Sequence, residues 1–542
     1  MRGLIQEFPL TLTHVFERAE RLFPDKTIVT AEGERTERTT YRQWAHGVRK
    51  LARALDSLDL PAFARVATFG WNTRRHLEVY YAAPCSGRVL HTINIRLSGD
   101  QIAFIIDHAE DSVIFVDRSL LPLLLPLLED RVSVKKVVVM ADGSDVELPA
   151  GDRFVDYDDL VGQHEPVREF PHLSEGDAAI LCYTSGTTGD PKGVLYSHRS
   201  SYLHAVAISH PDAMAVCEAD VILPVVPMFH ANMWGLAHAG IAAGSSFVLP
   251  GRDLSPPSIA RLMEEERVTL SAGVITVMSG VLPELRGRDV TALRMIPCGG
   301  SALPRSLSDA YDDALGVPLA TGWGMTETSP LASWTHLTTA QQDLPVEEQR
   351  DLRVLQGTPL LGVELRLCEP DETVPLPWDG KTRGEIQVRG AWAASSYYKA
   401  DSPGSFTEDG WLRTGDIATL SEEGFIHLVD RTKDLVKSGG EWISSADLEN
   451  HILAHPEVTE AAVIAVPHPV WVERPLACVV AVPGKAVSAE DILDWLRPRV
   501  AKWWLPDQVL FLDELPRTSV GKISKKDLRE RFAGRPPAGS DS

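Results

Sequence analysis

The sequence YTSGTTGDPKG, at Tyr183–Gly193, is the stretch that decides how the rest of this chain is interpreted. It places three glycines, several Ser and Thr hydroxyls and Lys192 within eleven residues. Because Gly and Pro occur too densely for a helix or a regular strand, the segment is predicted to be a loop. The apolar run Ala178–Cys182 precedes it, so a buried strand leads into a loop whose N–H groups can surround anionic oxygens.

The spacing excludes the usual P-loop, in which a Gly is followed by four residues and then Gly-Lys-Ser/Thr. Here Lys192 lies between Pro191 and Gly193. The loop instead resembles the signature loop of the adenylate-forming (AMP-binding) ligases. These include acyl-CoA synthetases, aryl-CoA ligases, peptide-synthetase adenylation domains and luciferases. Of these, the chain is most similar to the bacterial medium- and long-chain fatty acyl-CoA synthetases.

Length and composition are typical of a soluble globular protein with two or more domains. At 542 residues, the chain is too long for a single core. Its net charge of −22 argues against binding to nucleic acid or to an anionic membrane. The six cysteines form no C-x-x-C pair, the N-terminus lacks a signal peptide, and no apolar run is long enough to span a bilayer. These features predict a reduced, cytoplasmic protein.

Strand-like runs alternate with helical patterns through most of the chain, which favours an α/β architecture with parallel sheets. Strands are expected at 65–69, 112–116, 136–140, 178–182, 294–296, 385–388, 425–429, 458–466 and 477–482, and helices at 75–82, 98–109, 444–453 and 489–500. Short strands between 360 and 428 indicate a small β-rich subdomain. We expect an N-terminal adenylation domain at 1–430, with subdomains at about 1–175, 176–355 and 356–430. A hinge at 431–433, a mobile α+β C-terminal lid domain at 434–533 and a disordered tail at 534–542 would follow.

Five further segments match the family in chain order. They are CGGSALP at 298–304, TGWGMTET at 321–328, WLRTGD at 411–416, DRTKDLVKSGGEWIS at 430–444 and PRTSVGKISKK at 516–526. Alone, each is compatible with an ordinary turn or a charged linker. Together with the signature loop they span Tyr183 to Lys522, and the resemblance therefore covers essentially the whole chain.

The resemblance implies a site for ATP and its AMP product. Trp323 would stack on the adenine, Thr326 would contact phosphate, and Asp416 would bind the ribose hydroxyls. Glu327, with Thr184, would hold Mg²⁺, a hard ion that suits carboxylate and phosphate oxygens. The full set of nucleotide-binding candidates is Thr184, Ser185, Gly186, Thr187, Thr188, Lys192, Gly300, Ser301, Ala302, Gly322, Trp323, Gly324, Met325, Thr326, Asp416, Arg431 and Lys522.

The resemblance also assigns the remaining roles. Lys522 would touch the substrate carboxylate and the α-phosphate, where a compact cation stabilises the charge of the transition state. The catalytic candidates are thus Lys522, Glu327, Thr184 and His230. Lys433 would be the hinge, and CoA would bind at Lys437, Gly439, Gly440, Glu441 and Trp442. Lys525 and Lys526 are expected to be surface charges.

Two segments are expected to form the acyl pocket, VPMFHANMWGLA at 226–237 and AGVITVM at 272–278. The pocket candidates are His230, Trp234, Val274 and Gly299. By resemblance Trp234 gates a fatty-acyl tunnel, although the same apolar pattern is compatible with core packing. Neither segment contains an acidic residue, which disfavours an amino-acid substrate because its ammonium group would need a partner.

The predicted reaction joins a carboxylic acid, with a fatty acid favoured, to CoA through acyl-AMP and with release of pyrophosphate. Ile275 replaces the proline of the family's Gly-Val-Pro-Thr sequence. Therefore an aryl acid, or nitrite for diazotisation of an aryl amine, stays open as an alternative. A kinase or ATPase would release ADP instead. The expected small-molecule partners are the acid, ATP, Mg²⁺ and CoA, without nucleic acid; a monomer and a homodimer both stay open.

Overall fold

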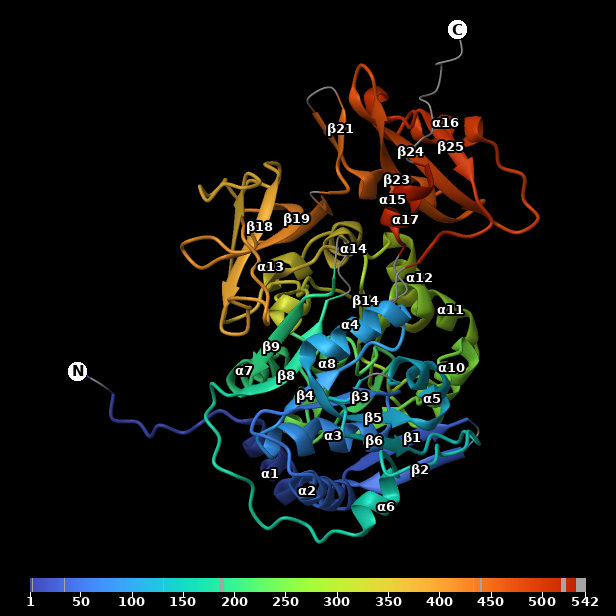
Figure 1. The fold of residues 1–542 in the computed structure, drawn as a ribbon. Helices are drawn as coiled ribbons and strands as arrows, with labels where there is room; N and C mark the ends of the chain where they lie inside the picture. The colour runs from blue at the N-terminus through green and yellow to red at the C-terminus, as the bar shows by residue number, and fades with distance from the viewer. Residues whose placement is uncertain are drawn as a thin grey trace.

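The computed structural model describes residues 1, 3–33, 35–129, 131–184, 190–431, 433–438, 441–517 and 523–532. Figure 1 shows a large body formed by the first two thirds of the chain, coloured blue to green. A smaller sheet, coloured yellow to orange, and a C-terminal unit, coloured orange to red, lie on one side of this body. This arrangement is the expected α/β architecture with a small C-terminal domain.

Two seven-stranded sheets form the body, and both are largely parallel. The first has the order β7-β6-β5-β3-β4-β8-β9, and only its β8–β9 pair is antiparallel. Its strands are β3 (Arg65–Phe69), β4 (Val89–Thr92), β5 (Asp111–Asp117), β6 (Lys136–Met140), β7 (Phe154–Asp156), β8 (Ala178–Tyr183) and β9 (Gly193–Ser197). The signature loop therefore joins β8 to β9 at one edge of this sheet.

The second sheet has the order β14-β13-β12-β10-β11-β1-β2, with an antiparallel β1–β2 pair at its edge. Its strands are β1 (Thr27–Glu32), β2 (Arg35–Thr40), β10 (Val221–Pro224), β11 (Ser246–Leu249), β12 (Leu270–Val274), β13 (Ile296–Gly299) and β14 (Leu319–Ala320). Apart from the polar edge strand β2, these short strands are mostly apolar, which suits a sheet that is covered on both faces.

Helices cover both sheets, and several begin at side-chain caps that the sequence predicts. Ser98, for example, forms a capping box with Gln101 at the start of α4. The helices of the body are α1 (Leu12–Leu22), α2 (Tyr41–Ser57), α3 (Arg74–Cys85), α4 (Gly99–Ala109), α5 (Leu121–Leu124), α6 (Tyr157–Gly162), α7 (His198–Ile208), α9 (Leu236–Ala243), α10 (Pro256–Glu265), α11 (Ile275–Glu284), α12 (Arg305–Leu315), α13 (Thr339–Gln342) and α14 (Val346–Arg353). Within the described ranges, no helix combines the length and the apolar character needed to cross a membrane.

The remaining strands form separate sheets. A two-stranded ribbon pairs β15 (Ser333–Trp334) with β16 (Thr358–Pro359), and an antiparallel sheet contains β17 (Val363–Cys368), β18 (Gly384–Gly390), β19 (Leu412–Leu420) and β20 (Ile426–Arg431). The C-terminal sheet contains β21 (Val436–Ser438), β22 (Glu441–Ile443), β23 (Val458–His468), β24 (Val472–Ala481) and β25 (Gln508–Phe511), with α15 (Ser445–Leu453), α16 (Ala489–Leu496) and α17 (Lys525–Phe532). The chain thus passes from one sheet to another between Arg431 and Val436.

Several predicted elements have other bounds in the structure. The strand expected at 477–482 is β24, which runs from Val472 to Ala481. The strand expected at 294–296 is β13, which runs from Ile296 to Gly299 and so includes the first residues of the Gly-Gly segment. Arg294 instead turns its guanidinium to the carboxylate of Asp220. The helix expected at 489–500 is α16, which ends at Leu496. Arg497 still has helical backbone, at φ −48° and ψ −43°, but Pro498 has no N–H to continue the helical hydrogen bonds.

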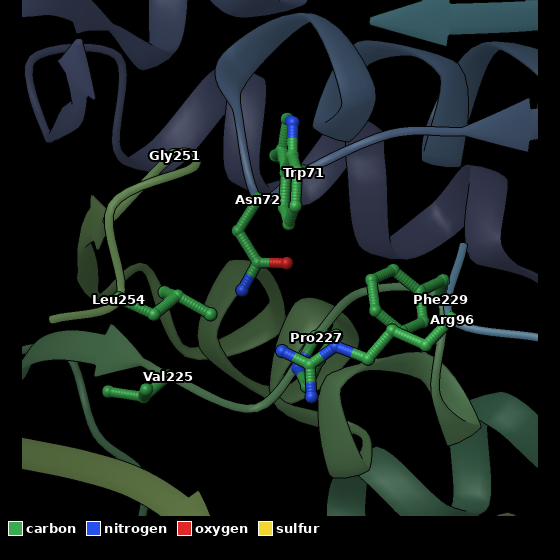
Figure 2. Close-up of a pocket in the computed structure, with 8 residues that line it drawn as sticks. All are labelled: Trp71, Asn72, Arg96, Val225, Pro227, Phe229, Gly251 and Leu254. Atoms are coloured by element: carbon green, nitrogen blue, oxygen red, sulfur yellow. The ribbon is translucent and has the colours of Figure 1, made fainter. Parts of the chain in front are cut away.

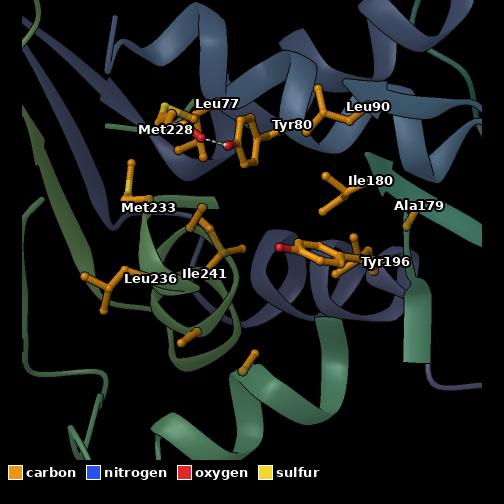
Figure 3. Close-up of a cluster of buried hydrophobic side chains, with 14 of the residues drawn as sticks. Leu77, Tyr80, Leu90, Ala179, Ile180, Tyr196, Met228, Met233, Leu236 and Ile241 are labelled. Atoms are coloured by element: carbon orange, nitrogen blue, oxygen red, sulfur yellow. Dashed lines mark hydrogen bonds between the residues drawn. The ribbon is translucent and has the colours of Figure 1, made fainter. Parts of the chain in front are cut away.

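A continuous core joins the two large sheets. Figure 3 shows side chains from α3, β4, β8, β9 and α9 in one apolar cluster, among them Leu77, Ile180 and Leu236. The hydroxyl of Tyr80, on α3, donates to the carbonyl of Met228 within this cluster. The chain that follows β10 is therefore held by a side chain of α3, the helix that follows β3 of the other sheet.

Candidate active site

The two ends of the signature loop are tied together. The N–H of Thr184 donates to the carbonyl of Lys192 at 2.9 Å, and the N–H of Lys192 donates to the hydroxyl of Thr184 at 3.3 Å. These two hydrogen bonds hold β8 and β9 together at the point where the signature loop begins and ends. The predicted ligands Ser185, Gly186, Thr187 and Thr188 lie outside the described residues.

Glu327 is a buried carboxylate with a defined partner. Its side chain lies in a short turn at Thr326–Thr328 and is 6% exposed. The hydroxyl of Tyr397 donates to Glu327 Oε1 at 2.6 Å. Burial raises the pKa of the Glu327 carboxyl, and the hydrogen bond from Tyr397 opposes this. Tyr196, in β9, donates its hydroxyl to the carbonyl of Thr326 at 2.5 Å and so ties this turn to the signature strand.

The Glu327 carboxylate fits the magnesium-binding role that the sequence predicts for it. A single buried carboxylate suits Mg²⁺, which is usually held by one or two carboxylates together with substrate phosphates. In the described part of the chain, no group of three or more His, Cys, Asp or Glu side chains is placed to hold a metal by itself. An ion held by Glu327 would therefore need oxygen atoms from the bound nucleotide.

Asp416 connects two of the predicted nucleotide-binding residues. Its Oδ2 accepts the indole N–H of Trp323 at 2.8 Å, and its Oδ1 lies 3.0 Å from Nε of Arg431. Asp416 and Arg431 face each other in the register of β19 and β20. The nearby Asp416 carboxylate is the main reason why the pKa of Arg431 is raised. Each carboxylate oxygen keeps a second lone pair, which leaves acceptors for ribose hydroxyls.

The glycines around Trp323 are required by the protein's own backbone. A Cβ on Gly322 would lie 2.3 Å from the carbonyl oxygen of Ser333, and one on Gly324 would lie 2.0 Å from that of Pro330. Trp323 itself is 4% exposed, so in this structure the ring is packed in protein and its edge holds Asp416. Its stacking on adenine stays a prediction, as does the contact of Met325 with the nucleotide. At the neighbouring turn Gly300 has φ +94°, which favours glycine, and Ser301 and Ala302 after it are exposed.

The segment that carries His230 and Trp234 has an unusual backbone. Ala231, Asn232, Met233 and Trp234 all have φ between +43° and +56°, and Gly235 follows at φ +81°. This left-handed turn is labelled α8 (Ala231–Trp234) in Figure 1. Left-handed backbone costs a non-glycine residue on the order of 1 kcal/mol. The surrounding core must therefore impose this conformation.

The turn places Trp234 over the predicted acyl pocket. A Cβ on Gly299 would lie 3.2 Å from Cη2 of Trp234, so the indole packs on the glycine. Gly299 pairs in register with Val274 across β12 and β13. Three of the four predicted pocket residues, Trp234, Val274 and Gly299, thus meet at the carboxyl ends of β12 and β13. The fourth, His230, immediately precedes the left-handed turn, and its N–H donates to the carbonyl of Pro227.

A small pocket lies beside the same segment. Figure 2 shows Trp71, Asn72, Arg96, Phe229 and Leu254 around it, at the carboxyl ends of strands from both large sheets. Asn72 donates to the carbonyls of Pro224 and Val226 at 2.8 and 2.9 Å and accepts the N–H of Met228 at 2.7 Å. It thereby holds the backbone that leads into Phe229 and His230.

The predicted hinge and CoA segments follow β20. Burial, and then the neighbouring Arg431, lower the pKa of Lys433 to about 8. Lys437 faces Trp442 across β21 and β22, with Nζ 4.7 Å from the centre of the indole ring. Glu441 forms the start of β22, while Gly439, Gly440, Lys522 and the tail at 534–542 lie outside the described residues.

The expectation that Lys525 is a surface charge is wrong. Its side chain is 15% exposed, and Nζ lies 2.8 Å from a carboxylate oxygen of Glu449 and 2.6 Å from the hydroxyl of Ser445. Lys526, in contrast, is 52% exposed. The helical start of α17 turns adjacent side chains in different directions, and Lys525 points to α15.

Sequence analysis did not identify Asn72, Tyr196, His204 or Tyr397 as contacts of the site. His204 accepts the N–H of Leu331 at 3.1 Å, and a Cβ on Gly235 would lie 2.4 Å from its ring. It thus connects the left-handed turn to the segment that follows Glu327. These contacts join segments that lie far apart in the sequence, so no local spacing signals them.

The order of these sites along the chain agrees with the comparisons. The family model of the AMP-binding enzyme matches residues 16–398, and that of the AMP-binding enzyme C-terminal domain matches residues 447–522. The chain belongs to the AMP-binding enzyme family.

Relatives of known activity extend over almost the full length of this AMP-binding enzyme. It is 41% identical to a 3-methylmercaptopropionyl-CoA ligase of Ruegeria lacuscaerulensis, over 98% of this chain and 99% of the relative. It is 44% identical to a long-chain-fatty-acid–CoA ligase of Thermus thermophilus, over 96% of each chain. The ATP-bound structure of MatB from Rhodopseudomonas palustris is similar, with a TM-score of 0.84, 26% identity, and coverage of 97% of this chain and 99% of MatB. The protein is therefore an adenylate-forming acyl-CoA ligase, whose substrates are ATP, an acid and CoA.

Proposed function

We propose that this ligase activates a fatty acid in the presence of Mg²⁺. The observation that carries the proposal is the packing of Trp234 on Gly299, which pairs with Val274 of the neighbouring strand β12. The absence of acidic residues from 226–237 and 272–278 suits an uncharged acyl chain. The relatives named for a long-chain fatty acid and for a thioether-substituted propionate support an aliphatic acid.

The replacement of the family's proline by Ile275 does not disturb the start of the adjacent helix. Ile275 is the first residue of α11, and Val274 is its N-cap. Proline is favoured at this first helical position, where the N–H has no partner within the helix. Because α11 begins there without proline, this departure from the family gives no reason to prefer an aryl acid over a fatty acid.

In the proposed first step, a carboxylate oxygen of the acid attacks the α-phosphorus of ATP, and the bond to pyrophosphate breaks. Lys522 would stabilise the charge on the reacting oxygens. Glu327, with Thr184, would hold Mg²⁺, which neutralises phosphate charge when bound. Asp416 and Arg431 would orient the ribose. In the second step the CoA thiolate attacks the acyl carbon and AMP leaves, with CoA held beside Lys437 and Trp442.

We further propose that the region after Lys433 changes its position between the two steps. Lys522 would serve the first step, and the Gly439–Gly440 segment the second. Lys522 and the Gly439–Gly440 segment both come after β20 in the sequence. One hinge at Lys433 would therefore move them together.

The test is a pyrophosphate-release screen with fatty acids of increasing chain length, aryl acids and nitrite, each with and without CoA. We expect the fastest release with a fatty acid, AMP as the nucleotide product and an acyl-CoA thioester only when CoA is present. Removal of Mg²⁺ by a chelator should stop the reaction. Fastest release with an aryl acid or with nitrite would contradict the fatty-acid proposal.

A further inference from the structure

A short segment after β18 contacts both Glu327, the proposed metal ligand, and the Lys192–Gly193 end of the signature segment. Tyr397 lies on the loop that follows β18 and is half-buried. Its hydroxyl donates to Glu327 Oε1 at 2.6 Å. The backbone N–H of Ala394, on the same loop, donates to the carbonyl of Glu327 at 2.7 Å. Both the side chain and the backbone of Glu327 are therefore held by this loop.

The same loop holds the end of the signature segment. Nζ of Lys192 lies 4.6 Å from the centre of the Tyr397 ring, within the range of a cation–π contact. The N–H of Tyr398 donates to the carbonyl of Gly193 at 2.8 Å. A Cβ on Gly193 would lie 3.1 Å from Cβ of Tyr398, so the two backbones approach closely. Tyr397 is thus in contact with the predicted metal carboxylate through its hydroxyl and with the signature lysine through its ring.

The geometry has a chemical consequence for Glu327. A carboxylate that accepts a hydrogen bond at one oxygen is fixed in rotation about its Cγ–Cδ bond, and its other oxygen is presented in a defined direction. Partners of this kind orient metal ligands, and their loss typically weakens metal affinity about 10- to 100-fold. The Tyr397 ring also limits where the Lys192 ammonium can lie, next to the phosphates that the signature loop is proposed to bind.

We propose that Tyr397 is a positioning residue that orients the Glu327 carboxylate for Mg²⁺ and places Lys192 beside the same phosphates. This inference rests on the proposed magnesium-dependent function. It assigns to one side chain the alignment of two motifs that lie far apart in the sequence. Tyr397 acts through Glu327 and Lys192 and does not itself touch the reacting atoms.

The test compares Tyr397→Phe with Tyr398→Phe in the full-length protein. ATP binding is measured by calorimetry without an acid substrate, so no turnover occurs, and Mg²⁺ is titrated at each ATP concentration. We expect Tyr397→Phe to raise the Mg²⁺ concentration needed for half-maximal ATP binding at least tenfold, while Tyr398→Phe leaves it within twofold of the wild type. The melting temperature without ligand reports any loss of fold in each variant.

A double-variant cycle separates orientation from general stability. If Tyr397 acts through Glu327, adding Tyr397→Phe to Glu327→Gln should change the Mg²⁺ dependence by less than twofold. An unchanged Mg²⁺ dependence in Tyr397→Phe, or equal losses in the Phe variants of Tyr397 and Tyr398, would overturn the proposal. If wild-type binding of ATP is itself independent of Mg²⁺, the magnesium part of the proposed function fails, and the assignment of Tyr397 fails with it.

Discussion

The indole N–H of Trp323 donates to the carboxylate of Asp416 at 2.8 Å, and these residues are 93 positions apart in the sequence. The contact joins the turn that precedes Glu327 to β19 of the small antiparallel sheet. Arg431 contacts the other carboxylate oxygen of Asp416, so Trp323, Asp416 and Arg431 are connected through the Asp416 side chain. The proposed ribose site is therefore set by a buried hydrogen bond as well as by an ion pair.

Trp323→Phe should weaken ATP binding about tenfold, because a hydrogen bond to a charged group is lost and Asp416 is less firmly oriented. The Michaelis constant for the acid should change little. Trp44→Phe is a matched control, since Trp44 is a fully buried tryptophan in another part of the core. Calorimetry measures the ATP affinity of both variants. An equal loss of ATP affinity in Trp323→Phe and Trp44→Phe would show that only core packing was disturbed.

Trp234→Ala should widen the range of acyl chains that the enzyme accepts, while ATP affinity stays within about twofold of the wild type. The physical reason is that the indole covers Gly299, and removing the ring opens space along β13. Met233→Ala, which truncates a buried side chain in the same turn, should destabilise the fold but keep the substrate range. Rates of pyrophosphate release across chain lengths provide the comparison. A lower melting temperature with unchanged specificity in Trp234→Ala would support the core-packing interpretation.

Asn232 offers a direct test of the left-handed turn. Its φ and ψ are 54° and 47°, where alanine is disfavoured and glycine is not. Both Asn232→Ala and Asn232→Gly remove the side chain, but the alanine variant should be less stable than the glycine variant by about 1 kcal/mol. Chemical denaturation measures the difference. A more stable alanine variant would mean that residue 232 is not left-handed in solution.

Local sequence signals were sufficient for much of the fold. The apolar run of β6 and the capping box of α4 are confirmed because hydrophobic pattern and side-chain caps act within a few residues. The small antiparallel sheet is also confirmed. The bounds of β13 were wrong because strand ends depend on pairing with β12 and β14, which local sequence does not specify.

The geometry of the site depended on contacts between distant segments. The segment ANMW at Ala231–Trp234 has no glycine or proline, so nothing in its composition predicts four left-handed residues. The hydrogen bond from Tyr397 to Glu327 spans 70 positions, and Tyr397 lies in none of the motifs. The family resemblance supplied the chemical roles, whereas these connections required the structure.

Buried histidines should make the protein less stable in acid. Burial, and then His238, lower the pKa of His204 to about 3, and its Nε2 accepts a backbone N–H, which requires the neutral ring. An unfolded histidine has a pKa of about 6.5, so between pH 6.5 and 3 the unfolded chain binds the proton and the folded chain does not. Stability therefore falls as the pH drops through this window, by about 1.4 kcal/mol per pH unit for each such group.

His204→Gln tests this contribution, because glutamine retains an acceptor and does not titrate. The variant should lose stability at neutral pH but show a shallower fall in melting temperature between pH 6.5 and 4. His210→Gln is the control, since the His210 side chain is 51% exposed. Identical slopes in the wild type and in His204→Gln would show that His204 does not remain neutral in the folded protein.

The last prediction concerns the proposed movement about Lys433. Lys522→Ala should reduce acyl-AMP formation by about 10²–10³-fold or more, as expected when a group that stabilises transition-state charge is lost. The same variant should still convert supplied acyl-AMP and CoA to the thioester. Lys433→Pro should show the opposite pattern, because proline fixes φ at the hinge and hinders the second position. Each half-reaction is measured separately, as pyrophosphate release without CoA and as thioester formation from acyl-AMP. If both variants remain folded and lose the two half-reactions equally, the two steps do not depend on different positions of the region beyond Lys433, and the movement is absent from this enzyme.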